Sequence, residues 1–220
     1  MKAVIFDLDG TLIDSVPDLH GASEKLLQDQ GKSPLDLPTI RSFVGNGVAN
    51  LVERISKATD LPLDEASQKS FIKAFLDHYN AALTGRTTLY PGVRDCLDAL
   101  AEAGIPMGLC TNKPEAQTLS ILKELDMAHY FGKVIGGDSL PQRKPAAEPL
   151  LTTLSALGDG NLSVDQCLYV GDSEVDAETA RVAGPAFALY SEGYRKAPLE
   201  SLPHTFSFSH FDALRAYVLA

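Results

Sequence analysis

The stretch Ala3-Val4-Ile5-Phe6-Asp7-Leu8-Asp9-Gly10-Thr11 joins an uninterrupted apolar run to two acidic residues and a glycine. A short apolar run without polar alternation is typical of a strand that is buried on both faces of a parallel sheet. Gly10 allows the chain to turn sharply directly after this strand. We therefore expect Asp7 and Asp9 at the carboxyl end of a buried strand.

Further apolar runs of the same kind occupy residues 106–110, 134–135, 167–170 and 186–190. Helical patterns lie between them, and their apolar side chains form two stripes: Val93, Cys96, Leu97 and Leu100, and Leu119, Leu122 and Leu125. Strands that alternate with helices indicate βαβ units. The predicted fold class is α/β, a doubly wound parallel sheet of the Rossmann-like kind.

Residues 15–88 have a different character, with three helical patterns and no strong strand. Pro17 lies near one end of this segment, and Gly85 and Pro91 lie near the other, where they mark connectors. We expect a core domain of residues 1–14 and 89–220, with an α-helical cap domain of residues 15–88 inserted into it. An insert at this position would overhang the ligand crevice of an open α/β sheet.

Composition limits the classes of partner. The chain has 220 residues, 45% of them hydrophobic and 22% charged, as in an ordinary globular protein. Its formal net charge of -10 argues against nucleic acid or an anionic membrane as a partner. No apolar run approaches the ~20 residues that span a bilayer, and the first run is too short for a signal peptide. The three cysteines, Cys96, Cys110 and Cys167, have no metal-type spacing, which favours reduced thiols and a cytoplasmic location.

The pair Asp7 and Asp9 has two interpretations. Two carboxylates one residue apart can divide a reaction, one attacking phosphorus or holding a metal ion and the other transferring a proton. An aspartate in a turn more often bonds only the nearby backbone. Crowded acids at the end of a buried strand nevertheless require a cation, so the structural interpretation is the costlier one.

Thr111-Asn112-Lys113 follows the second apolar run and precedes a predicted helix. A hydroxyl, an amide and the free backbone N–H groups of a helix start suit phosphate oxygens. The alternative is that Asn112 simply caps the helix.

Two further motifs have equally ordinary alternatives. Lys144, in Arg143-Lys144-Pro145, could neutralise a phosphate, although a single lysine in a loop is usually solvated. Asp172 follows the strand at 167–170, and Asp176 lies one helical turn later. Such oxygen ligands suit Mg²⁺, whereas the alternative is a helix cap formed by Asp172 or Ser173.

All four motifs follow strands of one inferred parallel sheet, at the edge where such folds bind ligands. In combination they resemble the signature motifs of the haloacid dehalogenase (HAD) superfamily, in particular its phosphatases with a helical cap after the first strand. The motifs are Asp7-Leu8-Asp9-Gly10-Thr11-Leu12, Thr111-Asn112, Lys144-Pro145 and Gly171-Asp172-Ser173-Glu174-Val175-Asp176, in the order of that family.

The resemblance implies a role for each of these residues. Asp7 would form an aspartyl-phosphate, and Asp9 would act as general acid and then as general base. Mg²⁺ would be held by Asp7, Asp172 and the carbonyl of Asp9. The remaining residues fall into two groups: Thr111, Asn112 and Lys144 would bind the phosphate, and Thr11, Ser173 and Asp176 would support the metal ligands.

Within this family the chain is similar to phosphoglycolate phosphatases, on the basis of Phe43-Val44-Gly45-Asn46-Gly47 and Leu140-Pro141-Gln142-Arg143-Lys144-Pro145. The resemblance implies hydrolysis of a small phosphorylated metabolite, 2-phosphoglycolate, and a substrate-specificity loop at Gly45, Asn46 and Gly47. The alternatives are a β-phosphoglucomutase-like phosphomutase, a phosphatase of other sugar phosphates or nucleotides, and a non-catalytic phosphate-binding protein. Monomer and homodimer both stay open.

Overall fold

The computed structural model describes residues 1–158 and 161–220. The chain divides into two compact units. The first consists of Met1–Asp14 and Leu89–Ala220, and the second of Ser15–Thr88. The short strands β2 (Ile13–Asp14) and β3 (Thr88–Leu89) pair with each other where the chain passes from one unit to the other.

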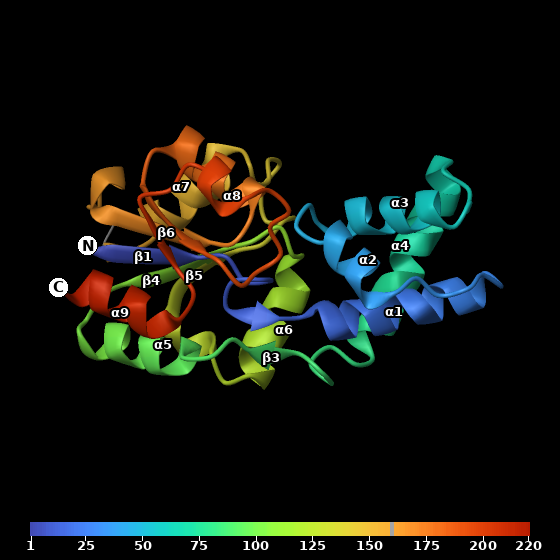
Figure 1. Cartoon of the computed structure of the whole chain (residues 1–220), viewed down its shortest axis with the longest axis horizontal. Coiled ribbons are helices and arrows are strands. Elements are labelled where there is room, and N and C mark those ends of the chain that lie inside the picture. The colour runs from blue at the N-terminus through green and yellow to red at the C-terminus, as the bar shows by residue number, and fades with distance from the viewer. Residues whose placement is uncertain (159–160) are drawn as a thin grey trace. The chain divides into compact units, whose positions relative to one another are not determined.

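The first unit is built on a six-stranded sheet whose strand order is β5-β4-β1-β6-β7-β8 (Figure 1). Its strands are β1 (Ala3–Phe6), β4 (Met107–Cys110), β5 (Phe131–Ile135), β6 (Cys167–Gly171), β7 (Ala186–Tyr190) and β8 (Phe206–Phe208). All neighbouring strands are parallel. In β1, Ile5 lies opposite Gly108 on one side and Tyr169 on the other. Every residue of β1 is inaccessible to solvent, as its continuous apolar run predicts.

Helices cover both faces of this sheet (Figure 1). One face carries α7 (Ala147–Ser155) and α8 (Glu174–Ala183), which enclose a buried cluster that includes Ile5, Leu150 and Tyr169. The other face carries α5 (Val93–Glu102), α6 (Glu115–Glu124) and α9 (Phe211–Leu219). These layers confirm the predicted doubly wound α/β fold.

The fold differs from the sequence-based predictions in two respects. The predicted stripe on α6 included Leu119, which is 47% exposed, whereas the helix buries Thr118, Ile121 and Leu122. Residues spaced regularly by three drift around a helix of 3.6 residues per turn, so Leu119 and Leu125 cannot both stay on one face. The edge elements β8 and α9 were not predicted at all.

The second unit consists of four helices: α1 (Val16–Asp29), α2 (Leu37–Phe43), α3 (Val48–Ala58) and α4 (Glu65–Asn80). α1 packs along α4 and α2, and α3 packs on α4. Two of these helices start at side-chain caps, where Asp36 accepts from the N–H of Thr39 and Asp64 from that of Ser67. The short helix α2 was not predicted, because seven residues make too brief an apolar pattern.

Asp18, in the first turn of α1, joins the start of this unit to its end. Its carboxylate accepts hydrogen bonds from the N–H groups of Arg86 and Thr87, at 3.0 and 2.7 Å, and from the Thr87 hydroxyl at 2.7 Å. Asp18 is buried, and these donors satisfy its charge. The two ends of the helical unit are thereby held next to each other.

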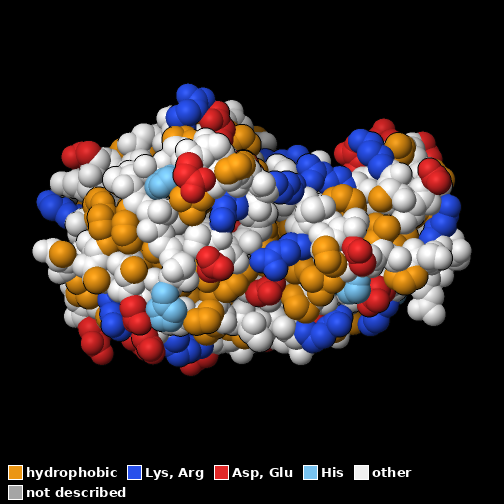
Figure 2. Space-filling model, viewed as in Figure 1, with side chains coloured by type: hydrophobic (Ala, Val, Ile, Leu, Met, Phe, Trp, Pro, Cys, Tyr) orange, Lys and Arg blue, Asp and Glu red, His pale blue; other side chains and the backbone are white. Residues whose placement is uncertain are grey.

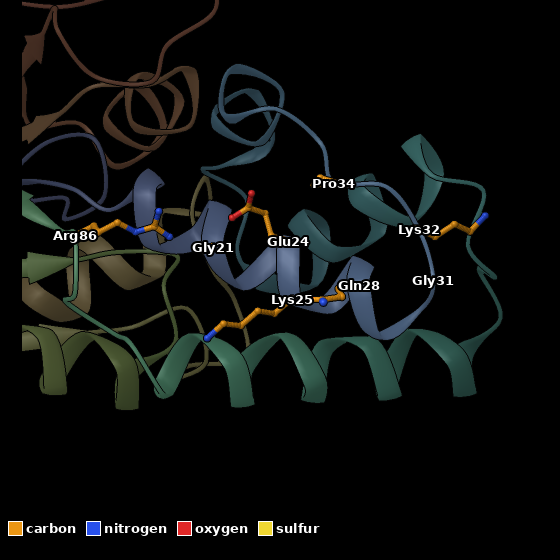
Figure 3. A pocket seen from close by; sticks show the side chains of 8 residues that line it. All are labelled: Gly21, Glu24, Lys25, Gln28, Gly31, Lys32, Pro34 and Arg86. Carbon is orange, nitrogen blue, oxygen red and sulfur yellow. The ribbon is translucent and has the colours of Figure 1, made fainter.

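A pocket of about 590 Å³ lies along α1 within the helical unit (Figure 3). Lys25, Lys32 and Arg86 are among the residues that line it. Figure 3 shows Lys25 and Lys32 extending in different directions, so the two ammonium groups do not converge on one ligand. None of the described helices has the length and hydrophobicity that crossing a membrane requires.

Candidate active site

Three of the predicted motifs start at the carboxyl ends of adjacent strands. Asp7 follows β1, Thr111 follows β4 and Asp172 follows β6, and these strands are neighbours in the sheet. The backbone N–H of Asp7 donates to the carbonyl of Val170 at 2.9 Å, and that of Thr111 donates to Ile135 at 3.0 Å. The sheet ladder therefore fixes the backbone on which these side chains stand.

A cluster of buried carboxylates forms at this edge. Oxygens of Asp7, Asp172 and Asp176 lie within 4.8 Å of one another. The ammonium group of Lys144 lies 2.8 Å from Asp7 Oδ1 and 2.7 Å from Asp176 Oδ1. With all four groups ionised, two negative charges would remain unbalanced in a site of low dielectric, which favours a divalent cation there.

Lys144 is 3% exposed, so the interpretation of an isolated loop lysine as solvated is wrong here. Its ammonium group also donates to the hydroxyl of Tyr169 at 3.0 Å. Burial alone would lower the pKa of Lys144, but the carboxylates of Asp176 and Asp7 raise it above its ordinary value. Lys144 is therefore a permanent cation at the centre of the cluster.

Burial is the main influence on the pKa values of two of the three acids, Asp7 and Asp172. It raises the pKa of Asp7 to about 6, against the lowering effect of Lys144. Burial, reinforced by the charges of Asp176 and Asp7, also raises the pKa of Asp172 well above its usual range. These shifts describe a site in which the carboxylates lack sufficient positive charge, and a metal ion held by Asp7 and Asp172 would supply it.

Asp176 differs from its neighbours because protein donors already surround it. One of its oxygens accepts from Lys144 Nζ and from the Tyr169 hydroxyl, at 2.7 and 2.6 Å. The other accepts from the N–H groups of Asp172 and Ser173 and from the Ser173 hydroxyl. Burial would raise the pKa of Asp176, but Lys144 and these hydrogen bonds lower it below its ordinary value. Asp176 thus organises the site without an oxygen left over for a further ligand.

The alternative interpretation of Ser173 as a helix cap also holds. Its hydroxyl accepts from the N–H of Asp176 and begins α8, while Asp176 bonds back to the N–H of Ser173. The same capping box therefore starts the helix and orients the acidic cluster. Structural and functional interpretations coincide at this motif.

Two donors hold the Asp172 carboxylate. Thr11 Oγ1 donates to Oδ1 at 2.8 Å, and the backbone N–H of Tyr194 donates to Oδ2 at 2.6 Å. Two glycines make room for it, since a Cβ at Gly10 would lie 2.5 Å from Oδ2 and one at Gly193 only 2.3 Å away. Gly10 also has a φ of +89°, which makes the predicted sharp turn after β1.

Thr111 and Asn112 are both buried beside this cluster. The side-chain amide of Asn112 donates to the backbone carbonyl of Lys144 at 3.0 Å and thereby joins the loop after β4 to the loop that carries Lys144. α6 begins after Pro114 without a side-chain cap, so the interpretation of Asn112 as a helix cap is wrong.

Asp9 pairs with Lys113, to which the sequence analysis gave no role although it belongs to the motif Thr111-Asn112-Lys113. Lys113 Nζ lies 3.1 Å from both oxygens of Asp9, and the lysine is only 6% exposed. Tyr169 and Tyr194 were also missed as site residues. The pairing of Lys113 with Asp9 joins residues far apart in the sequence, so no local pattern could reveal it.

The remaining predicted residues lie in the helical unit. Gly45, Asn46 and Gly47 form the connection between α2 and α3, where Gly45 and Gly47 have φ values of +117° and +82°. Positive φ values of this kind favour glycine over other residues, which explains why glycine occupies both positions. The loop's role in substrate choice stays a prediction.

Surface charge gives no separate binding patch on the face shown in Figure 2, where acidic and basic side chains are interspersed. None of the predicted site residues lines the pocket along α1. The candidate site is therefore the edge of the sheet. Its buried carboxylates, paired ammonium groups and hydroxyl donors are suited to receiving and releasing a phosphoryl group.

Comparison with known proteins supports this chemistry. Residues 4–190 match the family described as haloacid dehalogenase-like hydrolase. A phosphoglycolate phosphatase of Cereibacter sphaeroides is 45% identical over 97% of this chain and 96% of its own length, and one of Rhodobacter capsulatus is 43% identical over 98% and 96%. The crystal structure of a "predicted phosphoglycolate phosphatase" from Haemophilus somnus 129PT superposes with a TM-score of 0.91 at 32% identity, covering 99% of this chain and 98% of that one.

Proposed function

The chain belongs to the haloacid dehalogenase-like hydrolase family and is a phosphoric monoester hydrolase, and we propose that it hydrolyses 2-phosphoglycolate to glycolate and inorganic phosphate. The choice of substrate is supported by relatives of nearly equal length that are named phosphoglycolate phosphatase. The observation that carries the chemistry is the buried Asp7 carboxylate, 2.8 Å from the Lys144 ammonium group at the end of β1.

We further propose that the site works with Mg²⁺. The carboxylates of Asp7 and Asp172 and the backbone carbonyl of Asp9 would hold the ion, since hard oxygen ligands suit it. The raised pKa values of Asp7 and Asp172, both caused chiefly by burial, support this fit, whereas Asp176 is fully occupied by protein donors. Bound there, Mg²⁺ would offset the repulsion between a carboxylate nucleophile and an anionic phosphate.

In the first step, an oxygen of Asp7 attacks phosphorus and forms an aspartyl-phosphate, while the bond from phosphorus to the glycolate oxygen breaks. Asp9 gives its proton to that leaving oxygen. Lys144, Thr111 and Asn112 stabilise the charge on the transferring phosphoryl oxygens.

In the second step, Asp9 removes a proton from water, and the resulting oxygen attacks the same phosphorus. The bond to Asp7 breaks, inorganic phosphate leaves, and the Asp7 carboxylate is restored. The ion pair with Lys113 holds Asp9 in place between the two steps. We propose that the helical unit acts as a cap that excludes water and selects the leaving group.

The test is a panel of phosphate monoesters assayed for phosphate release with and without Mg²⁺, together with acid quenching of the reaction with ³²P-labelled 2-phosphoglycolate. We expect Mg²⁺-dependent release, with 2-phosphoglycolate preferred, and a labelled protein adduct that is absent in Asp7→Asn. Efficient release without a divalent cation would contradict the metal assignment. Transfer of the phosphoryl group to a sugar phosphate in place of phosphate release would contradict hydrolysis and indicate a phosphomutase.

A further inference from the structure

Lys113 is a buried ammonium group outside the central carboxylate cluster. It directly follows Thr111 and Asn112 at the end of β4, and its Nζ lies 3.1 Å from Asp9 Oδ1 and 3.1 Å from Asp9 Oδ2. Lysine is rarely buried unless it is paired. This pairing places a positive charge beside the residue that we propose as the proton donor to the leaving group.

The backbone of Lys113 is held on both sides. Its N–H donates to Thr111 Oγ1 at 3.2 Å, and its carbonyl accepts from the N–H of Gly137 at 2.8 Å. A Cβ at Gly137 would lie 2.2 Å from the carbonyl oxygen of Asn112, so the two loops are in close contact. Lys113 therefore projects from a fixed support, which is what selective recognition requires.

The two buried lysines among the described residues belong to different parts of the site. Lys144 lies between Asp7 and Asp176, where the phosphoryl group is transferred. Lys113 lies next to Asp9, where the leaving oxygen must accept its proton. The charge of Lys113 therefore acts on the leaving group more directly than on the phosphoryl group.

These contacts limit how far the leaving group can lie from Lys113 Nζ. A proton donor must lie within ~3 Å of the oxygen that it protonates. Since Lys113 Nζ is 3.1 Å from either Asp9 oxygen, the leaving oxygen lies at most ~6 Å from Nζ when Asp9 protonates it. In a leaving group of the form O–CH₂–COO⁻, the carboxyl carbon is ~2.5 Å from that oxygen, as ordinary bond lengths dictate. Such a carboxylate comes within reach of the ammonium group.

We infer that Lys113 is a specificity-determining residue that selects phosphate esters whose leaving group carries a carboxylate one carbon from the ester oxygen. The inference rests on the proposed function and gives it a structural basis in the core unit. An ammonium group has three N–H donors, so one lysine can serve Asp9 and a substrate carboxylate together. A charge-assisted contact of this kind corresponds to roughly 10- to 100-fold in kcat/KM.

The test compares 2-phosphoglycolate with ethyl phosphate, which has the same chain length and no carboxylate. The variants are Lys113→Met and Lys113→Arg. The control is Lys123→Met, which removes an exposed lysine of α6, the helix that follows Lys113 in the chain. We expect the ratio of kcat/KM for the two substrates to fall about 10- to 100-fold in Lys113→Met, to fall less in Lys113→Arg and to stay unchanged in Lys123→Met.

Loss of the Asp9 contact alone would lower kcat/KM for both substrates equally and leave their ratio unchanged. That result would overturn the specificity role and leave the proposed function intact. A wild-type protein that hydrolyses ethyl phosphate but not 2-phosphoglycolate would refute both. Circular dichroism checks the fold of each variant, and Lys113→Gln provides the same comparison if Lys113→Met fails to fold.

Discussion

Replacing Lys144 with methionine keeps a side chain of similar length but removes the only ammonium group that contacts Asp7 and Asp176 among the described residues. Lys144 has three close partners, with Nζ at 2.7 Å from Asp176, 2.8 Å from Asp7 and 3.0 Å from the Tyr169 hydroxyl. Removing one partner of a buried ion pair leaves an uncompensated charge and costs about 3–5 kcal/mol. For a chain of this size, that loss corresponds to roughly 6–20 °C in melting temperature.

The loss of stability in Lys144→Met should become smaller as the pH is lowered. Lys144 stays charged between pH 5 and 7.5, because its pKa is raised, so the pH dependence of the loss comes from the carboxylates that Lys144 contacts. In the variant, the buried carboxylates of Asp7 and Asp176 have no ammonium partner. The pKa of Asp7 therefore rises beyond its wild-type value of about 6, and the pKa of Asp176 is no longer held below its ordinary value. Protonation then relieves the destabilisation, so the deficit shrinks as the pH is lowered to 5.

Thermal and urea unfolding followed by circular dichroism, in chelator at pH 7.5 and pH 5, measure both effects. Lys123→Met removes an exposed lysine and should stay within about 0.5 kcal/mol of the wild type. A loss below about 1 kcal/mol in Lys144→Met at pH 7.5, or an equal loss at both pH values, would refute the view that Lys144 compensates a buried charge cluster.

Three further changes test other parts of the site. Asp7→Asn should keep its circular dichroism spectrum and lose phosphate release by at least about 10⁴-fold, as expected for a nucleophile, and more than a few per cent of residual turnover would contradict that role. In the metal-free protein, the raised pKa of Asp7 makes the folded state bind more protons, so the contribution of Asp7 to the free energy of unfolding should fall by about 3 kcal/mol as the pH rises from about 4 to 6. Excess Mg²⁺ should remove that pH dependence. A stability that does not change with pH in chelator would contradict the raised pKa of Asp7. Gly193→Ala brings a Cβ within 2.3 Å of Asp172 and should raise the Mg²⁺ concentration for half-maximal activity about 10-fold or more. Gly85→Ala, whose Cβ would meet nothing closer than 3.6 Å, is its control, and equal Mg²⁺ requirements would count against Asp172 as a ligand.

Much of the core unit could be predicted because its central strands carry their own signal. β1, β4, β6 and β7 are continuous apolar runs, and parallel strands bring their carboxyl ends to one edge. That topology was sufficient to expect Asp7 and Asp172 near each other. The edge strand β8 has no comparable run: its three residues are Phe206, Ser207 and Phe208, and it was missed.

Side-chain partnerships were harder to predict than strands. Lys144 and Lys113 resemble ordinary loop lysines in the sequence, and their burial depends on carboxylates contributed by other strands. Asn112 resembled a helix cap, yet its amide joins two loops. Local propensity describes a residue in its own segment, whereas these functions arise from contacts between segments.

The hydrogen bonds of Asp18 have a consequence for how such a protein can diversify. Because one side chain in the first turn of α1 binds the backbone at Arg86 and Thr87, the helical insert begins and ends at a single point. The entropy cost of closing a loop grows only slowly with its length, so the length of the segment between those two ends has little effect on the folding of the sheet that carries it. The insert is in this sense a replaceable module. Helices can be lengthened, exchanged or redesigned between residues 19 and 85, while the strands that hold Asp7, Thr111 and Asp172 keep the same register.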